Sequence, residues 1–204
     1  MEDIFRLSDF GYEHLTELTL DGLLTRLSET TWVRTGAVLG PEERMSALAA
    51  QLPARLVVSH ATAWWVHVGL GRAPSPLTLT THPRRRVLET TGLVVHELSL
   101  ARGDWETIAG HPVTTPVRTL YDLLLPLVRD PRRASGPQIA ALIDDVPGDM
   151  VRRLRLYLAE VGRRPYAAQM RQVVDHFTRP GRAPGIRAAT ALRSDEETQP
   201  PEMR

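Results

Sequence analysis

Two pairs of polar residues are the first candidates for chemistry in this chain: Ser59 with His60, and Arg118 with Asp122. A serine beside a histidine would suit nucleophilic catalysis, but neighbours on a helix do not face each other, so this pair is not a catalytic-triad signal. Residues four apart on a helix do face each other, so Arg118 and Asp122 can form an ion pair. Neither pair has a further base or nucleophile at a recognisable spacing, and we expect no enzyme active site.

Histidines are the residues here that most invite a metal site. His60 and His67 stand seven residues apart in a helical pattern, hence on one face. Their neighbours are apolar, and the chain contains no H-E-x-x-H, H-x-H or carboxylate spacing typical of metal ligands. We interpret them as core or capping histidines, and predict neither a metal nor a cofactor.

Two residue types are missing from the chain, and their absence excludes whole classes of chemistry. There is no cysteine, which excludes disulfides, thiolate metal sites and thiol nucleophiles. All 25 basic residues are arginine, so no lysine can serve a phosphate-loop NTPase, a Schiff base or a D/E-x-K nuclease. The sequence also has no run of eighteen apolar residues and no signal-peptide layout, so we expect a cytoplasmic protein without a membrane partner.

Arginines are concentrated in the C-terminal half of the chain. Residues 1–60 carry five arginines and nine acidic residues, a net charge of −4, whereas residues 129–193 carry thirteen arginines and six acidic residues, a net charge of +7. In a predicted helix over residues 149–161, an apolar stripe leaves arginines on the other faces. Such a ridge contacts nucleic acid or an acidic partner, or is simply a solvated helix face. Its candidate binding residues are Arg152, Arg153, Arg155, Arg163, Arg164 and Arg171.

A second arginine group, Arg84, Arg85 and Arg86, follows Pro83 on a predicted loop between strands. Adjacent side chains of an extended segment point to alternate sides, so the three cannot all face one partner. The group is either a phosphate-contacting tip or a solubilising turn.

The elements that must position these residues form an α+β pattern. Ser59 is expected to cap one apolar helix, while Thr115 caps another that begins with Pro116. Further helices are predicted at residues 9–28, 42–52, 138–145, 149–161 and 166–177. Extended segments are predicted at residues 32–39, 77–80 and 92–98, with a hairpin over 104–114. This gives a small mixed or antiparallel sheet packed with helices, followed by a helical C-terminal region and a disordered tail.

Two ordered motifs carry a resemblance to a known family. The first is S-H-x-[ST]-A followed by a glycine, here Ser59, His60, Thr62, Ala63 and Gly69; the second is T-T-P-x-R-T-L-x-D-L, here residues 114–123. In this order and spacing they resemble the AbiEi family of type IV antitoxins, in particular its actinobacterial branch. Between them, Arg84 to Arg86 and the strand from Gly92 to His96 look like the family's basic patch and its "G-x-x-V-H" strand. The resemblance covers roughly residues 20–125.

The resemblance implies a domain plan and a function. Residues 1–55 would be a truncated, degenerate winged-helix-like segment, 56–128 a central α+β domain, 129–178 basic helices and 179–204 a tail. Arg118 and Asp122 would act as a structural clamp between helix and sheet. The implied function is a cytoplasmic regulator that counters a nucleotidyltransferase toxin, directly or indirectly, and represses its own operon by binding operator DNA. The alternative is a non-enzymatic protein-interaction module without DNA binding.

Charge argues against DNA binding by the N-terminal segment. A recognition helix must approach phosphates, and each neutralised phosphate adds affinity through counterion release. The net negative charge of residues 1–60 opposes this. We therefore predict no salt-sensitive duplex binding by residues 1–58 alone, and place the working surface on the arginine-rich helices after Asp130. The sequence makes no prediction of oligomeric state.

Overall fold

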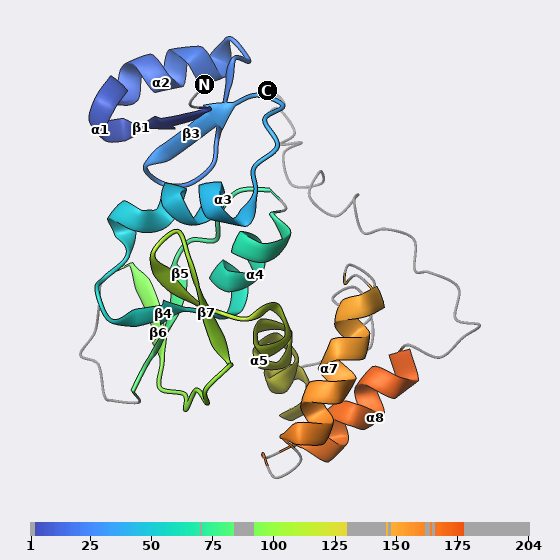
Figure 1. The fold of residues 1–204 in the computed structure, drawn as a ribbon. Helices are drawn as coiled ribbons and strands as arrows, with labels where there is room; N and C mark the ends of the chain where they lie inside the picture. Colours follow the sequence, from blue (N-terminus) through green and yellow to red (C-terminus); the bar gives the residue numbers. More distant parts are fainter. Residues whose placement is uncertain are drawn as a thin grey trace, which may run out of the picture. The chain divides into compact units, whose positions relative to one another are not determined.

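The structure, a computed structural model, describes residues 3–69, 71–83, 92–129, 146, 148–161, 164 and 166–177 (Figure 1). It divides into two units, residues 1–123 and 124–204, each of which is described by itself. Helices and two small sheets make up the described residues, which confirms the α+β class. None of the helices in the described ranges is long and apolar enough to cross a membrane.

The first five elements form a strand, two helices and a hairpin. They are β1 (Ile4–Arg6), α1 (Leu7–Phe10), α2 (Tyr12–Leu20), β2 (Leu24–Arg26) and β3 (Thr31–Arg34). The strands form an antiparallel sheet in the order β1-β3-β2. The helical prediction for residues 9–28 is wrong at its end, because the chain turns at Gly22 with φ +74° and Leu24 lies in a strand. Leucines at 23, 24 and 27 fit a helical period, and only the glycine marks the break.

β3 is buried on both of its faces. Trp32 packs with Leu15 and Leu24 beneath α2, whereas Val33 belongs to the larger core that also contains Leu56. The predicted domain boundary between residues 55 and 56 therefore falls inside a continuous core, and the N-terminal elements are one unit with the central sheet.

The next elements are two helices and the middle strand of the central sheet. They are α3 (Pro41–Leu48), extended by a 3-10 turn (Ala49–Gln51), then β4 (Leu56–Val58) and α4 (His60–Val68). Pro41 occupies the first turn of α3, where its missing N–H costs no hydrogen bond. Gly69 ends α4 in the left-handed conformation, and a Cβ there would lie 2.1 Å from Nη1 of Arg44. Only glycine fits this position without displacing the arginine.

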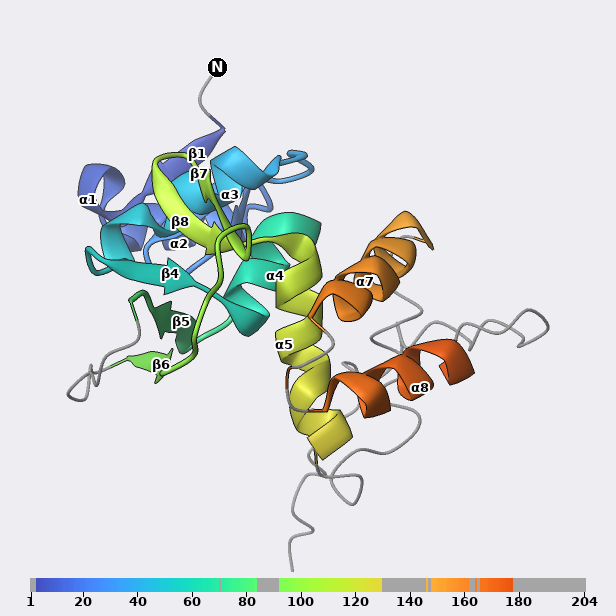
Figure 2. The same cartoon turned by 60° about the horizontal axis from the view of Figure 1, so that its bottom comes forward.

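The central sheet has five strands in the order β6-β5-β4-β8-β7. The new strands are β5 (Leu77–Thr81), β6 (Leu93–His96), β7 (Trp105–Ile108) and β8 (His111–Thr114). β4 is antiparallel to β5 but parallel to β8, so the sheet is mixed, as predicted. α4 lies against β5 (Figure 2). Thr80 and Thr81 of β5 are buried along with Leu77 and Leu79, whereas alternation predicted a half-buried strand.

The remaining helices are α5 (Pro116–Arg129), α7 (Gly148–Glu160) and α8 (Ala167–Phe177). On α7 the predicted stripe is buried at Val151, Leu154 and Leu158, and α7 packs against α8. Tyr166, the first residue of the helix predicted at 166–177, precedes α8 and is exposed. The predicted linker at 131–137, the helix at 138–145 and the tail from 179 lie outside the described residues.

Candidate functional site

The second motif builds the start of α5 as predicted. Oγ1 of Thr115 accepts a hydrogen bond from the amide of Arg118 at 3.4 Å, the geometry of an N-cap, and Pro116 is the first helical residue. Behind the cap, the hydroxyls of Thr114 and Thr119 lie 2.7 Å apart. Both threonines are fully buried. Because Thr114 ends β8 and Thr119 lies in the first turn of α5, their hydrogen bond connects the strand to the helix.

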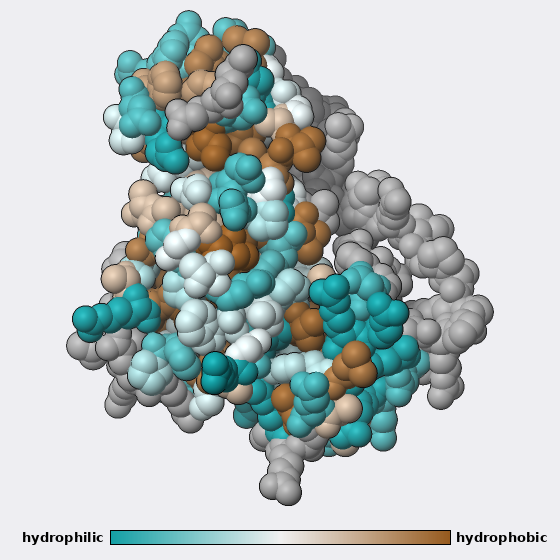
Figure 3. Space-filling view, in the orientation of Figure 1, coloured by the Kyte–Doolittle hydropathy of each residue, from teal (hydrophilic) through white to brown (hydrophobic). Residues whose placement is uncertain are grey.

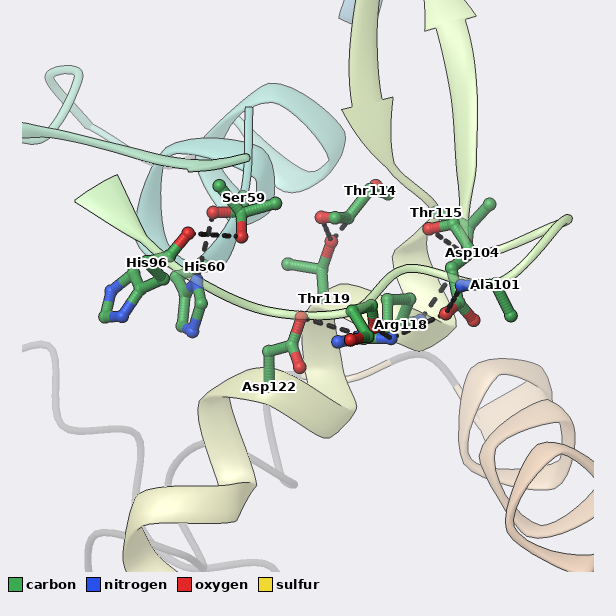
Figure 4. Close-up of polar contacts among 12 residues, drawn as sticks. Ser59, His60, His96, Ala101, Asp104, Thr114, Thr115, Arg118, Thr119 and Asp122 are labelled. Atoms are coloured by element: carbon green, nitrogen blue, oxygen red, sulfur yellow. Dashed lines mark hydrogen bonds and ion pairs between the residues drawn. The ribbon is translucent and has the colours of Figure 1, made fainter. Parts of the chain in front are cut away.

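Arg118 forms the predicted ion pair with Asp122 and binds two residues that the sequence did not indicate. Its Nε donates to Asp122 at 2.9 Å, and its Nη1 donates to Asp104 at 2.6 Å and to the Ser99 carbonyl at 3.3 Å (Figure 4). Arg118, Asp104 and Asp122 are each at most 3% exposed. A buried arginine between two carboxylates is tolerated only when its charge and its donors are satisfied.

Asp104 ties this clamp to the loop before β7. Its carboxylate accepts the amide of Ala101 at 2.7 Å, and its carbonyl accepts the amide of Thr115 at 3.0 Å. Asp104 lies fourteen residues before Arg118, so no helical or strand period relates the two. Nothing in the A-R-G-D-W segment predicts that its aspartate pairs with Arg118.

Ser59 occupies the N-cap position of α4, but its side chain does not cap the helix, which corrects the prediction. Its Oγ lies instead 3.0 Å from Nδ1 of His60. The two side chains meet because Ser59 is extended, at φ −145°, while His60 has φ +47°, so neither follows regular helical geometry. Ser59 is completely buried, so this contact orients the imidazole ring and leaves the hydroxyl unreachable for a substrate.

His60, at the start of α4, stacks on a histidine from strand β6. Its ring centroid lies 4.0 Å from that of His96 at the end of β6, with 24° between the planes (Figure 4). Burial, followed by the charges of His96 and Arg118, lowers the pKa of His60 to about 3. Burial also lowers the pKa of His96. The stacked rings are therefore neutral near pH 7, and the pair holds the start of α4 against β6.

The other motif residues also have structural partners. Oγ1 of Thr62 accepts the amide of Thr78 at 2.7 Å, which fixes α4 to β5. His67 shares a 2.8 Å hydrogen bond with the Thr114 carbonyl, and burial lowers its pKa. His60 and His67 thus have separate partners. Within the described part of the chain, no group of three or more potential metal-binding side chains is clustered.

The C-terminal ridge is exposed along α7 and α8. Arg152, Arg153, Arg155 and Arg171 are exposed. The described residues of this unit contain six arginines and three acidic residues, and the visible surface of the two helices is largely hydrophilic (Figure 3).

Three ridge residues are held by other side chains. Arg153 forms an ion pair at 3.3 Å with Asp149, one turn earlier on α7. Arg155 forms an ion pair at 3.0 Å with Asp175 of α8. Arg164 donates to the Tyr157 hydroxyl at 2.7 Å and is half-buried. The predicted site residues Arg84, Arg85, Arg86 and Arg163 lie outside the described residues.

The helix that precedes the N-terminal hairpin has the opposite character. Its exposed residues are Tyr12, Glu13, His14, Glu17 and Leu20. Residues 7–25 contain no arginine. A phosphate backbone approaching this face would meet carboxylates and no arginine.

Comparison with known proteins adds little to this geometry. No family model and no curated protein matches the chain. Among solved structures, it is similar to the RV2827C protein from Mycobacterium tuberculosis, with 20% sequence identity and a TM-score of 0.38. The match covers 82% of this chain and 66% of that one, so this chain spans just under two thirds of that protein's length.

Proposed function

We propose that this protein is an antitoxin-like regulator, resembling the AbiEi family, that counters a nucleotidyltransferase toxin without being an enzyme itself. The observation that carries the proposal is the joint scaffold made by the two motifs. The cap at Thr115 and the clamp of Arg118 with Asp104 and Asp122 join α5 to the sheet. Ser59 and His60 lock α4 to β6. Motif residues buried in this way maintain a fold and leave recognition to exposed side chains.

The arginine ridge of α7 and α8 is the surface that we assign to recognition. Arg152, Arg153 and Arg171 are exposed there, and arginines outnumber acidic residues. Guanidinium groups suit phosphates and carboxylates equally, so this face fits nucleic acid or an acidic protein partner.

The N-terminal elements support only part of a DNA-binding role. The order strand, helix, turn, helix and hairpin supports the interpretation of these elements as the later part of a winged helix, in which α2 would be the recognition helix. However, α2 exposes Glu13 and Glu17 toward solvent. We therefore propose that α2 does not contact operator DNA.

A second candidate function is a protein-interaction module without DNA binding. The observation in its favour is a group of exposed apolar side chains around α1 and α2: Phe10, Tyr12, Leu20 and Leu23 are 44%, 56%, 83% and 57% exposed. Apolar residues beside carboxylates are typical of a surface that docks a protein.

Co-expression tests the proposed function. A nucleotidyltransferase toxin of the kind that the resemblance implies is induced in a bacterial host with or without this chain, and an active-site variant of the toxin serves as control. We expect the toxin to stop colony formation and the full chain to restore it. Failure of well-expressed protein to restore growth would reject the antitoxin function. If growth is not restored but a partner protein co-purifies, the interaction module is favoured.

A further inference from the structure

A pocket of about 730 Å³ lies within the first unit, beside the hairpin β2–β3. Its walls come from that hairpin, from the segment 36–41 that leads into α3, and from the end of α4 with the turn after it. None of the motif residues described above lines it except Gly69, so the pocket is separate from the scaffold around Arg118.

Four arginines line this pocket: Arg26, Arg34, Arg44 and Arg72. Among the described residues that form its walls there is no aspartate or glutamate. Residues 1–60 carry a net charge of −4, yet three of their five arginines gather here. A concave surface lined by one sign of charge concentrates its field on the enclosed volume.

Neighbouring carboxylates orient three of these arginines. Arg26 and Arg72 share a single carboxylate, that of Glu29, at 3.0 and 2.7 Å. Arg34 pairs with Asp3 at 3.1 Å, and this pair is about half exposed. Exposed pairs of this kind are weak and exchange readily with another anion.

Arg44 differs from the other three because it is buried and is held by carbonyls. Its Nε donates to Val66 at 2.8 Å, its Nη2 donates to His67 at 3.2 Å, and its Nη1 donates to Leu39. Burial lowers its pKa, although the charge of Glu43 acts in the opposite direction. Carbonyls satisfy its donors but do not neutralise its charge, apart from the partial negative charge at the end of α4.

The rest of the wall is apolar or glycine. Leu27, Val33 and Val68 provide apolar surface, while Gly36 and Gly71 have no side chain and open space beside their Cα atoms. The volume lies in the range of small-molecule sites, roughly 300–1,000 Å³, and is far larger than one phosphate ion needs. Guanidinium groups also stack on planar rings, as Arg26 does on Trp32 at 5.2 Å.

We propose that this pocket binds a free nucleoside polyphosphate, with its phosphates on the arginines and its base against the apolar and guanidinium surfaces. The site is independent of the antitoxin function, which neither requires nor excludes it. Binding would draw together β3, the segment before α3 and the end of α4, because each of them contributes an arginine or a wall residue.

Calorimetric titration of the full chain tests the proposal. ATP and GTP are titrated at about 0.15 M salt, with tripolyphosphate and a single-stranded hexanucleotide as comparison ligands. We expect saturable binding of one nucleotide, weakened at least about tenfold by the double variant Arg34→Gln/Arg72→Gln, because each removed guanidinium takes away a charge-assisted hydrogen bond. The matched control is Arg102→Gln, an exposed arginine outside the pocket, which should leave binding unchanged.

Each of the other outcomes overturns the proposal. The first is that neither nucleotide gives a saturable binding heat, and the second is that Arg102→Gln weakens nucleotide binding as much as the double variant does. The third is that tripolyphosphate binds as tightly as ATP, and the last is that the hexanucleotide binds more tightly than either nucleotide. The last would assign the pocket to a nucleic-acid strand. Arg34 and Arg72 are partly exposed, so the double variant should fold, and its thermal unfolding midpoint checks this.

Discussion

At the scale of single residues, the clamp around Arg118 shows what the sequence can and cannot predict. Its pairing with Asp122 follows from a spacing of four on a helix and is confirmed. Asp104 and His96 could not be predicted as partners, because their contacts with Arg118 and His60 join separate elements. The failed cap at Ser59 has a local cause, the positive φ of His60, which no propensity indicates.

Breaking the clamp should destabilise the protein strongly. Asp104→Asn leaves Arg118 buried beside one carboxylate instead of two, and removing one partner of a buried ion pair typically costs about 3–5 kcal/mol. The control is Asp149→Asn, which removes the exposed pair with Arg153 at 3.3 Å and should cost less than about 1 kcal/mol. Urea unfolding at constant pH measures both. Equal destabilisation of the two variants would show that the clamp is not the stabilising contact.

The histidine stack should make stability depend on pH in one direction. The pKa of His60 is lowered from its ordinary 6.5 to about 3, so between these values the unfolded chain binds more protons than the folded one. Its contribution to stability is therefore complete above 6.5 and is lost as the pH falls toward 3.

Urea unfolding at pH 7 and at about pH 4.5 measures this dependence. His60→Gln should lose less stability between the two pH values than the unmodified protein does, because the stacked titratable ring is gone. His14→Gln, at an exposed position, should retain the full pH dependence. An unchanged pH dependence in His60→Gln would contradict the role given to the stack.

At the scale of elements, periodicity predicted where helices and strands lie better than how deeply they are buried. α7, β7 and β8 lie where their patterns placed them, and the stripe of α7 is buried while Leu156 opposite it is 62% exposed. The burial of β3 on both faces could not be predicted. Trp32 and Val33 point to opposite faces of the strand in any case, and this pattern does not say whether one face or both are covered. Its second cover comes from a core assembled mainly by later residues.

β3 should therefore be essential to the first unit. Trp32→Ala removes a side chain that is 2% exposed and should cost about 3–5 kcal/mol, the usual range for an aromatic deletion in a core. Val38→Ala, at a position 98% exposed, should change stability by less than about 0.5 kcal/mol. Denaturant unfolding compares the two. A Trp32→Ala effect as small as that of Val38→Ala would mean that the N-terminal elements do not contribute to the stability of the unit.

The arginine ridge should act as one electrostatic element. We expect the full chain to bind duplex DNA from its own upstream region with a clear salt dependence and no preference for an inverted repeat. The triple variant Arg152→Gln/Arg153→Gln/Arg171→Gln should reduce the slope of log K against log salt by up to about 0.9 for each phosphate that is no longer neutralised.

Fluorescence anisotropy at about 0.05 and 0.15 M salt measures the slope. Glu13→Gln/Glu17→Gln, the control on α2, should leave the slope intact and strengthen binding, because it removes negative charge. A slope that survives the triple variant would place the DNA-binding surface somewhere other than the ridge.

At the scale of the whole molecule, the charge distribution separates roles along the chain. Residues 1–60 are acidic and residues 129–193 are basic. The net charge of the described residues has the same sign in each segment. Sequence alone placed the working surface on the basic helices, but it could not reveal the arginine-lined pocket. That pocket gathers Arg26, Arg34, Arg44 and Arg72 from separate stretches of the chain, three of them in an acidic region. The net charge of a segment does not show which of its arginines lie close together in the folded protein.

We propose that the antitoxin-like activity resides in the arginine ridge and not on α2. Colony formation is measured under co-expression with a nucleotidyltransferase toxin of the kind that the resemblance implies, with the unmodified chain, the triple arginine variant and Glu13→Gln/Glu17→Gln expressed at equal levels. We predict that the unmodified chain and the α2 variant restore growth and that the arginine variant does not. Growth restored by the arginine variant but abolished in the α2 variant would contradict the assignment of the activity to the arginine ridge.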